Sequence, residues 1–156
     1  VSLDKDYMPE PEIDSDARFA EWSRKLGQPA VVVSYEREVD PTRLIGLTGP
    51  YCCYLTRTIV SPEAREAYVV LGNSDSFRLY LNGEEIAEVD ECTMWAPFNN
   101  TVKVDLKEGE NHLLLKLVRH GDTQRFTLGF REATDRWRPN SQNCEDWIVG
   151  LADVVP

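Results

Sequence analysis

The sequence has few of the features that mark membrane or nucleic-acid-binding proteins. Its apolar runs, such as Ala30 to Val33, are far shorter than the roughly 20 consecutive apolar residues of a membrane span. Basic residues are scarce, with 17 Lys and Arg against 27 Asp and Glu, and the resulting net charge of −10 repels phosphate backbones and anionic membranes. We therefore expect neither nucleic acid nor a membrane among the partners.

Cysteine is also sparse. Four residues, Cys52, Cys53, Cys92 and Cys144, are too few and too unevenly placed for a disulfide framework, and they contain no Cys-x-x-Cys pair of the kind that binds zinc. The chain has 156 residues, 42% of them hydrophobic. A single domain of this size buries roughly 70% of the surface of its unfolded chain, so it needs no disulfide or metal to fold.

Recognisable catalytic motifs are missing as well. The two histidines, His112 and His120, do not adjoin a Gly-x-Ser-x-Gly elbow or a cysteine-nucleophile motif, and there is no Gly-rich loop of the kind that holds phosphate. Carboxylates are numerous but scattered, so that no pair stands out as acid and base. We expect no enzymatic activity from this chain alone, and no cofactor.

The first residues are typical of an extended segment followed by one helix. Residues 1–12 are acidic and contain two prolines, and no export signal is visible, although the start at Val1 rather than Met is that of a processed or internal boundary. Asp14 or Ser15 can cap a helix over residues 15–26, in which Phe19, Trp22 and Leu26 share a face.

Everything after Pro29 is predicted to be β-structure, because apolar residues alternate with polar ones at a period of two. Residues 113–118 are almost continuously apolar, which is typical of a strand buried on both faces. The predicted strands lie at residues 30–35, 54–60, 67–72, 77–81, 85–89, 102–106, 113–118 and 126–131. The prediction is an all-β fold, an antiparallel β-sandwich or jelly roll of about eight strands with a short N-terminal helix.

The dipeptide Asn82-Gly83 is the strongest local signal. Both central residues of a type I′ turn need a positive φ, which Asn tolerates and Gly prefers, so this pair is predicted to close a tight hairpin. We divide the chain into residues 1–28 as an N-terminal extension, 29–132 as the sandwich and 133–156 as an apolar tail that docks on it.

Two runs in the middle of the chain resemble the galactose-binding-domain-like superfamily. They are the Tyr-Leu-Asn-Gly hairpin at residues 80–83 and the Leu-Lys-x-Gly-x-Asn-x-Leu-Leu-Leu-Lys turn at residues 106–116, and the resemblance covers about residues 51–132. It implies a jelly roll of the type that occurs as an accessory or carbohydrate-binding domain of glycoside hydrolases. The two runs describe how strands are joined and do not identify a ligand.

Candidate binding residues collect at one end of the predicted sandwich. Connections between antiparallel strands alternate between its two ends, which gathers the longer loops at a single end, where a rigid scaffold can present binding residues. Aromatic rings stack on sugar C–H groups, and Asp, Asn and Arg bond to hydroxyls, so these side chain types suit a glycan. The candidate ligand-binding residues are Trp95, Asn99, Asn100, Arg119, His120, Asp122, Tyr51 and Asp75.

Plainer interpretations of these residues stand beside the functional one. Trp95 is equally suited to a lid on the core, Tyr51 to core packing, and residues 119–122 to a solvated turn. Two metal sites are conceivable, although no metal is predicted. The first is a thiolate and imidazole site from Cys52 or Cys53 with Cys92 and His120. The second is a structural calcium held by Asp75, Asp90, Glu91 and Asp122.

The function predicted from these observations is that of a non-catalytic carbohydrate-binding module. Its expected partners are a neutral glycan, given the acidic charge, and the catalytic domain of the same parent chain. The alternative is a structural accessory domain that packs against the catalytic domain without binding sugar. The sequence leaves the sugar, the compartment and the oligomeric state undecided.

Overall fold

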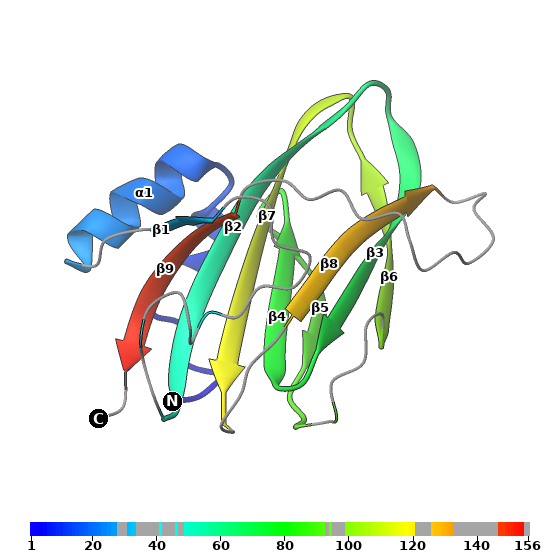
Figure 1. Cartoon of the computed structure of the whole chain (residues 1–156). Coiled ribbons are helices and arrows are strands. Elements are labelled where there is room, and N and C mark those ends of the chain that lie inside the picture. Colours follow the sequence, from blue (N-terminus) through cyan, green and yellow to red (C-terminus); the bar gives the residue numbers. More distant parts are fainter. Residues whose placement is uncertain are drawn as a thin grey trace.

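The computed structural model describes residues 1–27, 31–33, 41, 46, 49–92, 94, 99–120, 126–132 and 147–154, and all structural statements below concern these residues. They form two antiparallel β-sheets that pack face to face, with one α-helix on the outside (Figure 1). The predicted all-β sandwich with a short N-terminal helix is therefore confirmed. No helix in these ranges is long and apolar enough to cross a membrane.

The larger sheet has six strands in the order β1-β9-β2-β7-β4-β5, and the smaller has three in the order β6-β3-β8. All pairings between neighbouring strands are antiparallel. The strands are β1 (Val31–Val33), β2 (Tyr51–Ser61), β3 (Arg65–Asn73), β4 (Ser76–Leu81), β5 (Glu84–Val89), β6 (Asn100–Leu106), β7 (Gly109–Arg119), β8 (Phe126–Glu132) and β9 (Trp147–Val154). Each of the eight predicted strands is present, and β9 is an additional one.

Strand β9 comes from the predicted apolar tail. It lies between β1 and β2, where Leu55 pairs with Val149 and Val149 in turn pairs with Val31. Part of the tail is thus a central strand of the larger sheet.

The main core fills the space between the two sheets. Strands β2, β4 and β7 contribute alternate residues to it, such as Leu55, Leu79 and Leu115, and the smaller sheet contributes Val69 and Leu71. Residues 113–118 are buried on both faces of β7, as predicted, because a second apolar cluster covers the outer face of the same sheet. The second cluster is formed by Leu3, Met8, Ile13, Phe19, Cys52, Tyr54, Tyr80, Leu114 and Val118.

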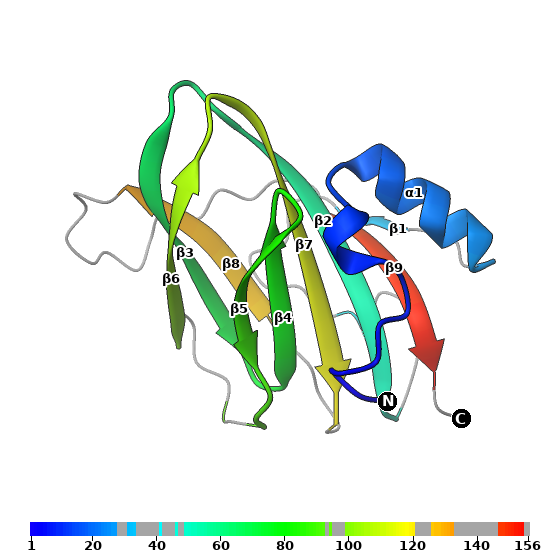
Figure 2. The ribbon, with the colours of Figure 1, turned by 180° about the vertical axis from the view of Figure 1, so that it is seen from behind.

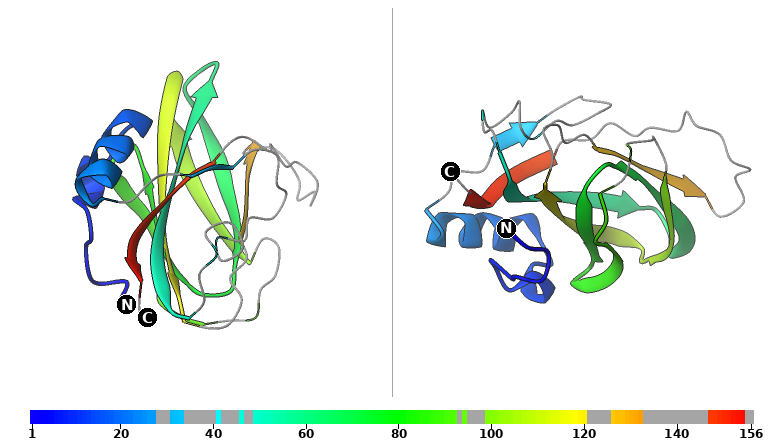
Figure 3. Two further views of the ribbon diagram at one scale, coloured as in Figure 1. Left: turned by 60° about the vertical axis from the view of Figure 1, so that its left-hand side comes forward. Right: turned by 90° about the horizontal axis from the view of Figure 1, so that it is seen from below.

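The cover on this outer face is the beginning of the chain. Residues 1–13, here called the N-terminal segment, run across the larger sheet and include a single 3-10 turn, η1 (Glu10–Glu12), where an extended chain was predicted (Figure 2). Helix α1 (Asp16–Lys25) follows and packs on β2 and β9. The right panel of Figure 3 shows the segment and α1 on one side of the larger sheet and the smaller sheet on the other.

Helix α1 has the predicted cap and one unexpected face. The Ser15 hydroxyl accepts a hydrogen bond from the Arg18 N–H at 3.3 Å, which satisfies an otherwise unpaired amide of the first turn. Phe19 is buried and Trp22 is partly buried, but Leu26 is exposed. The hydrophobic face predicted over Phe19, Trp22 and Leu26 therefore holds for its first two members only, because the helix ends at Lys25 and Leu26 is its C-cap residue.

A buried histidine anchors α1 to the sheet. The Nε2 atom of His112 lies 3.3 Å from Asp16 Oδ1, and it also contacts the Thr56 hydroxyl. The hydroxyls of Thr56 and Thr58 each donate to Asp16 at 3.1 Å. Burial lowers the pKa of His112 although Asp16 opposes this shift, so the neutral imidazole is the form that the fold favours.

The two sequence runs that carried the family resemblance bond to each other. Asn82 and Gly83 have φ values of 53° and 83°, as a type I′ turn requires. Asn111 binds the next turn through Lys107 N–H and C=O at 3.0 and 2.9 Å. The Asn82 side chain then donates to Asn111 Oδ1 at 3.1 Å and accepts from the His112 N–H at 2.9 Å. Both asparagines are therefore structural residues.

Candidate functional site: a pocket at the long-loop end of the sandwich

Strand register gathers the predicted loops at one end of the molecule. Tyr51, at the start of β2, pairs with Arg119 at the end of β7. Ser76, at the start of β4, pairs with Val118 beside it, and in the smaller sheet Leu71 pairs with Asn100. The prediction that one end of the sandwich collects these loops is confirmed.

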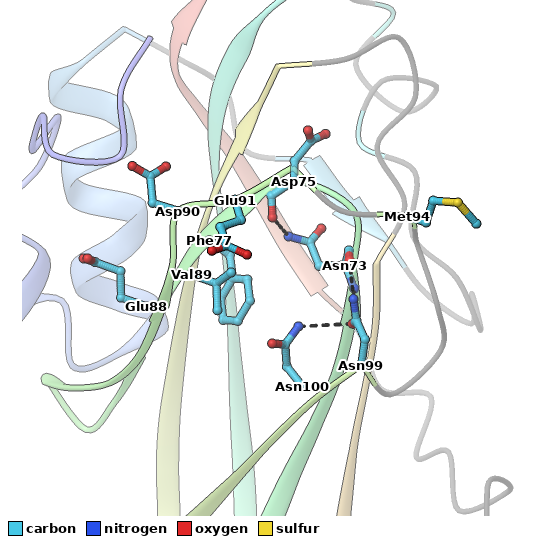
Figure 4. Close-up of a pocket in the computed structure, with 10 residues that line it drawn as sticks. All are labelled: Asn73, Asp75, Phe77, Glu88, Val89, Asp90, Glu91, Met94, Asn99 and Asn100. Carbon is cyan, nitrogen blue, oxygen red and sulfur yellow. Dashed lines mark hydrogen bonds between the residues drawn. The ribbon is translucent and has the colours of Figure 1, made fainter.

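A pocket of about 580 Å³ opens at this end (Figure 4). Its walls come from the ends of β3, β4, β5 and β6 and from the residues that follow β5. The lining residues are Asn73, Asp75, Phe77, Glu88, Val89, Asp90, Glu91, Met94, Asn99 and Asn100. Four carboxylates and three amides thus surround two apolar side chains, with the exposed Met94 at the rim.

Hydrogen bonds fix the three asparagines. The Asn73 N–H donates to Asn99 Oδ1 at 3.1 Å, and Asn99 Nδ2 donates back to the Asn73 carbonyl at 2.9 Å. Asn100 Nδ2 donates to Asn99 Oδ1 at 3.1 Å, and Asn73 Nδ2 donates to the Asp75 carbonyl (Figure 4). The β3 and β6 ends are therefore tied together by side chain amides, which hold these groups in place.

Two acceptor atoms in this wall are buried without a hydrogen-bond partner among the described residues. They are Asp75 Oδ2 and Asn73 Oδ1. The other carboxylate oxygen of Asp75 accepts from Cys92 Sγ at 3.4 Å, and burial together with this hydrogen bond raises the pKa of the Cys92 thiol. An unsatisfied buried acceptor costs about 1–3 kcal/mol, so a donor that reached either atom would be stabilising.

Beside the pocket, Ser76 contacts both Asp90 and His120. The Ser76 hydroxyl donates to Asp90 Oδ1 at 2.7 Å and lies 3.3 Å from His120 Nε2. Asp90 is thereby oriented, and the exposed imidazole of His120 lies beside the acidic rim. His120 itself is not a lining residue.

Apart from His120, which lies beside the pocket, the predicted binding residues separate into three groups. Asp75, Asn99 and Asn100 line the pocket. Tyr51 and Arg119 are buried and contact each other, with the guanidinium 5.5 Å from the ring centroid and Arg119 Nη1 donating to the Gly49 carbonyl at 2.9 Å.

The third group consists of Trp95 and Asp122, which lie outside the described residues. Prediction from sequence missed Asn73, Phe77 and Glu88. The available signal for Asn73 and Phe77 was their place on either side of the short turn that contains Asp75.

Neither conceivable metal site is seen in the described part of the chain. In that part, Cys53 and Cys92 are free thiols. Across the described ranges, no group of three or more His, Cys, Asp or Glu side chains is arranged to hold a metal ion.

Comparison with known proteins identifies the class of fold. No protein-family model matches the chain, and no curated protein matches it. Among solved structures, the chain is similar to a part of the β-glucosidase from Kluyveromyces marxianus in complex with glucose. The identity is 19% over 64% of this chain and 13% of the enzyme, and the TM-score is 0.50. This likeness shows the fold, a two-sheet sandwich of the kind that the resemblance to galactose-binding-domain-like proteins predicts.

Two further solved structures are similar over part of the chain. A lectin from Pleurotus ostreatus in complex with GalNAc has 12% identity over 77% of this chain and 39% of the lectin, with a TM-score of 0.46. The PA14 domain of the antifreeze protein MpAFP has 16% identity over 54% of this chain and 44% of that structure, with a TM-score of 0.46. The chain spans less than half the length of each of these three proteins.

Proposed function

We propose that this chain is a carbohydrate-binding domain and that its ligand is a neutral sugar held in the pocket at the long-loop end. The observation that carries the proposal is a polar wall that hydrogen bonds already hold in place, in which two acceptors, Asp75 Oδ2 and Asn73 Oδ1, have no partner among the described residues. Sugar hydroxyls are donors of the kind these acceptors require, and Phe77 and Val89 supply apolar surface for C–H groups.

The charge of the pocket supports a neutral ligand. Asp75, Glu88, Asp90 and Glu91 all line it, and the whole chain carries a net charge of −10. This potential opposes sulfated or uronate-rich glycans.

We also propose that the domain serves a larger glycoside hydrolase without catalysing the reaction itself. The support is the structure of the K. marxianus β-glucosidase with glucose, because the similar region is a small part of that enzyme. The catalytic domain of the parent chain would then be the second partner.

The test is a glycan array followed by calorimetry on the wild type and Asp75→Asn. The variant keeps the volume of the side chain but replaces a carboxylate acceptor by an amide. Since a hydrogen bond to a charged group contributes about 1.5–3 kcal/mol, affinity should fall by about 10- to 150-fold. Asp4→Asn, an identical charge change on an exposed residue of the N-terminal segment, serves as the matched control and should bind as the wild type does.

A second variant examines the aromatic candidate. Trp95→Ala removes the ring that the sequence singles out for stacking on sugar, and loss of binding without a large fall in Tm would support that role. If no glycan binds the wild type, the proposal fails. The structural accessory domain would then be the function to examine, by asking whether the chain binds the catalytic domain of its parent.

A further inference from the structure

The outer face of the larger sheet carries a row of polar residues at its centre. In the strand register, Tyr54 of β2 lies directly opposite Lys116 of β7, and Lys116 lies directly opposite Arg78 of β4. Tyr80 is two residues further along β4 and therefore on the same face. Two cations and two phenols from three adjacent strands thus converge where the sheet would otherwise present apolar side chains.

The buried carboxylate of Glu10, from the N-terminal segment, occupies the centre of this group, and the exposed carboxylate of Asp6 lies at its edge, 3.4 Å from Arg78 Nη1 and 3.6 Å from Lys116 Nζ. Glu10 Oε1 accepts from Lys116 Nζ at 2.7 Å and from the Tyr54 hydroxyl. Glu10 Oε2 accepts from the Tyr80 hydroxyl at 2.5 Å and lies 3.5 Å from Arg78 Nη1. Glu10 and Lys116 are both 0% exposed. Burial raises the pKa of the Glu10 carboxyl, but the hydrogen bonds from Lys116, Tyr54 and Tyr80 outweigh this, so the pKa is lowered overall.

The same ammonium group also binds the backbone of the segment. Lys116 Nζ donates to the carbonyls of Leu3 and Lys5, both at 2.7 Å. With Glu10, these bonds use all three donors of the ammonium group. Leu3 and Met8 pack on the apolar residues beside it. The face thus recognises three features together, namely a carboxylate, backbone carbonyls and apolar side chains.

We infer that this face is a binding site for a carboxylate carried on an extended peptide, and that the N-terminal segment fills it in cis. The donors belong to the sheet and are held in register by its backbone hydrogen bonds, so the site does not depend on the segment for its shape. A buried ion pair is rarely the most stabilising way to cover a sheet, since apolar residues of similar volume are often as good. The arrangement is better explained as selection of one buried carboxylate, that of Glu10, with Asp6 as an exposed second contact.

Occupancy in cis sets a condition for any other ligand. A segment joined to the sheet by the same chain is present at an effective concentration in the millimolar range or above. An acidic peptide from a partner must therefore reproduce the backbone and apolar contacts of the N-terminal segment, as well as its carboxylate, in order to displace it. This site adjoins the pocket through Arg78, which binds the lining residue Glu88 at 2.6 Å, but the inference does not rest on the proposed function.

The experiment removes the carboxylate and supplies it again from solution. Glu10→Ala deletes one methylene and one carboxylate, which together correspond to acetate. We expect acetate to raise the Tm of Glu10→Ala saturably, because a ligand present at 100 times its Kd raises the folding equilibrium constant about 100-fold. Sodium chloride at equal ionic strength should not do so. Glu12→Ala, an exposed neighbour in the same 3-10 turn, and the wild type should not respond to acetate.

Three results would overturn the inference. One is the absence of an acetate effect on Glu10→Ala, and another is an equal effect of acetate and chloride on every variant. The third is an acetate response that survives in the double variant Glu10→Ala with Lys116→Met, since the bound carboxylate should then have lost its main partner. If Glu10→Ala does not fold in chloride buffer, the same titration is followed as recovery of the near-UV circular dichroism. Failure of acetate to restore that signal counts equally against the site.

Discussion

The substitution Lys116→Met tests how strongly the buried ion pair contributes to the fold. Methionine keeps an unbranched apolar stem and removes only the ammonium group. Glu10 would remain at 0% exposure without its closest cation, and the carbonyls of Leu3 and Lys5 would each lose a bond of 2.7 Å. Removing one partner of a buried pair costs about 3–5 kcal/mol, because the remaining charge is left uncompensated.

This loss is large on the scale of a single domain. A domain has a total unfolding free energy of about 5–15 kcal/mol, so the variant should lose about a fifth or more of its stability. For a chain of this length, about 2–4 °C in Tm corresponds to each kcal/mol, and the expected fall in Tm is about 6–20 °C. Arg78 reduces the expected loss of stability, since its guanidinium lies 3.5 Å from the Glu10 carboxylate and still compensates part of its charge.

The measurement is urea unfolding of the wild type, Lys116→Met, Glu10→Gln and the double variant. The losses of unfolding free energy in the two single variants should add up to at least about 1 kcal/mol more than the loss in the double variant, because groups in contact are energetically coupled. Lys103→Met is the matched control, since Lys103 forms an ion pair of 2.6 Å with Glu66 but both side chains are about half exposed. Its cost should stay below about 1 kcal/mol. A Lys116→Met cost as small as that, or additive losses, would refute the reasoning.

Two further predictions concern the turn and the buried histidine. Gly83→Ala should destabilise more than Gly109→Ala in urea unfolding, since both glycines have a φ above 80° but a Cβ at Gly83 would lie 2.6 Å from the Pro11 carbonyl oxygen and a Cβ at Gly109 would meet nothing within 4 Å. Equal losses would contradict the contact. Because burial lowers the pKa of His112, the unfolded chain takes up the proton first, and stability should fall as pH drops through about 6.5, the unfolded pKa. In His112→Gln the urea midpoint should change less between pH 7.5 and 5.5 than it does in the wild type. An equal change of the midpoint with pH in both proteins would exclude His112 as the cause.

Most strands were predictable because their signals are local. Alternation at a period of two identifies a half-buried strand without knowledge of its partners, and the Asn82-Gly83 turn follows from the φ values that the two residues tolerate. Strand β9 was not predicted as a strand. Its apolar sequence contains Gly150 and lacks clean alternation, and its place is decided by pairing with β2, about 100 residues earlier in the chain.

The candidate site was predictable to the extent that topology determines it. Alternating strand direction brought Asp75, Asn99 and Asn100 to the correct end of the sandwich. Tyr51 and Arg119 were expected in loops, but β2 starts at Tyr51 and β7 continues to Arg119, so both lie within the sheet and are buried. Strand ends depend on pairing and are the least local feature of a strand.

In the larger sheet, the alternation of strand residues between two faces determines both the apolar core and the carboxylate site. Neighbouring residues of β2, β7 and β4 form two rows across the larger sheet, one facing the core and one facing the N-terminal segment. The inward row is Leu55, Leu115 and Leu79, and the outward row is Tyr54, Lys116 and Arg78.

A slip of one residue would exchange these rows and place two cations in the core, so burial of the leucines alone is enough to specify where the cations lie. In the sequence, the only sign of the outward row was Lys116 within a run of leucines. The role of Lys116 became clear only from its ion-pair partner Glu10, which lies more than 100 residues earlier in an acidic segment and gives no local sign of burial. Arg78 extends the outward row to the pocket, since it also binds the lining residue Glu88 at 2.6 Å. The register that builds the core therefore positions groups of both proposed sites.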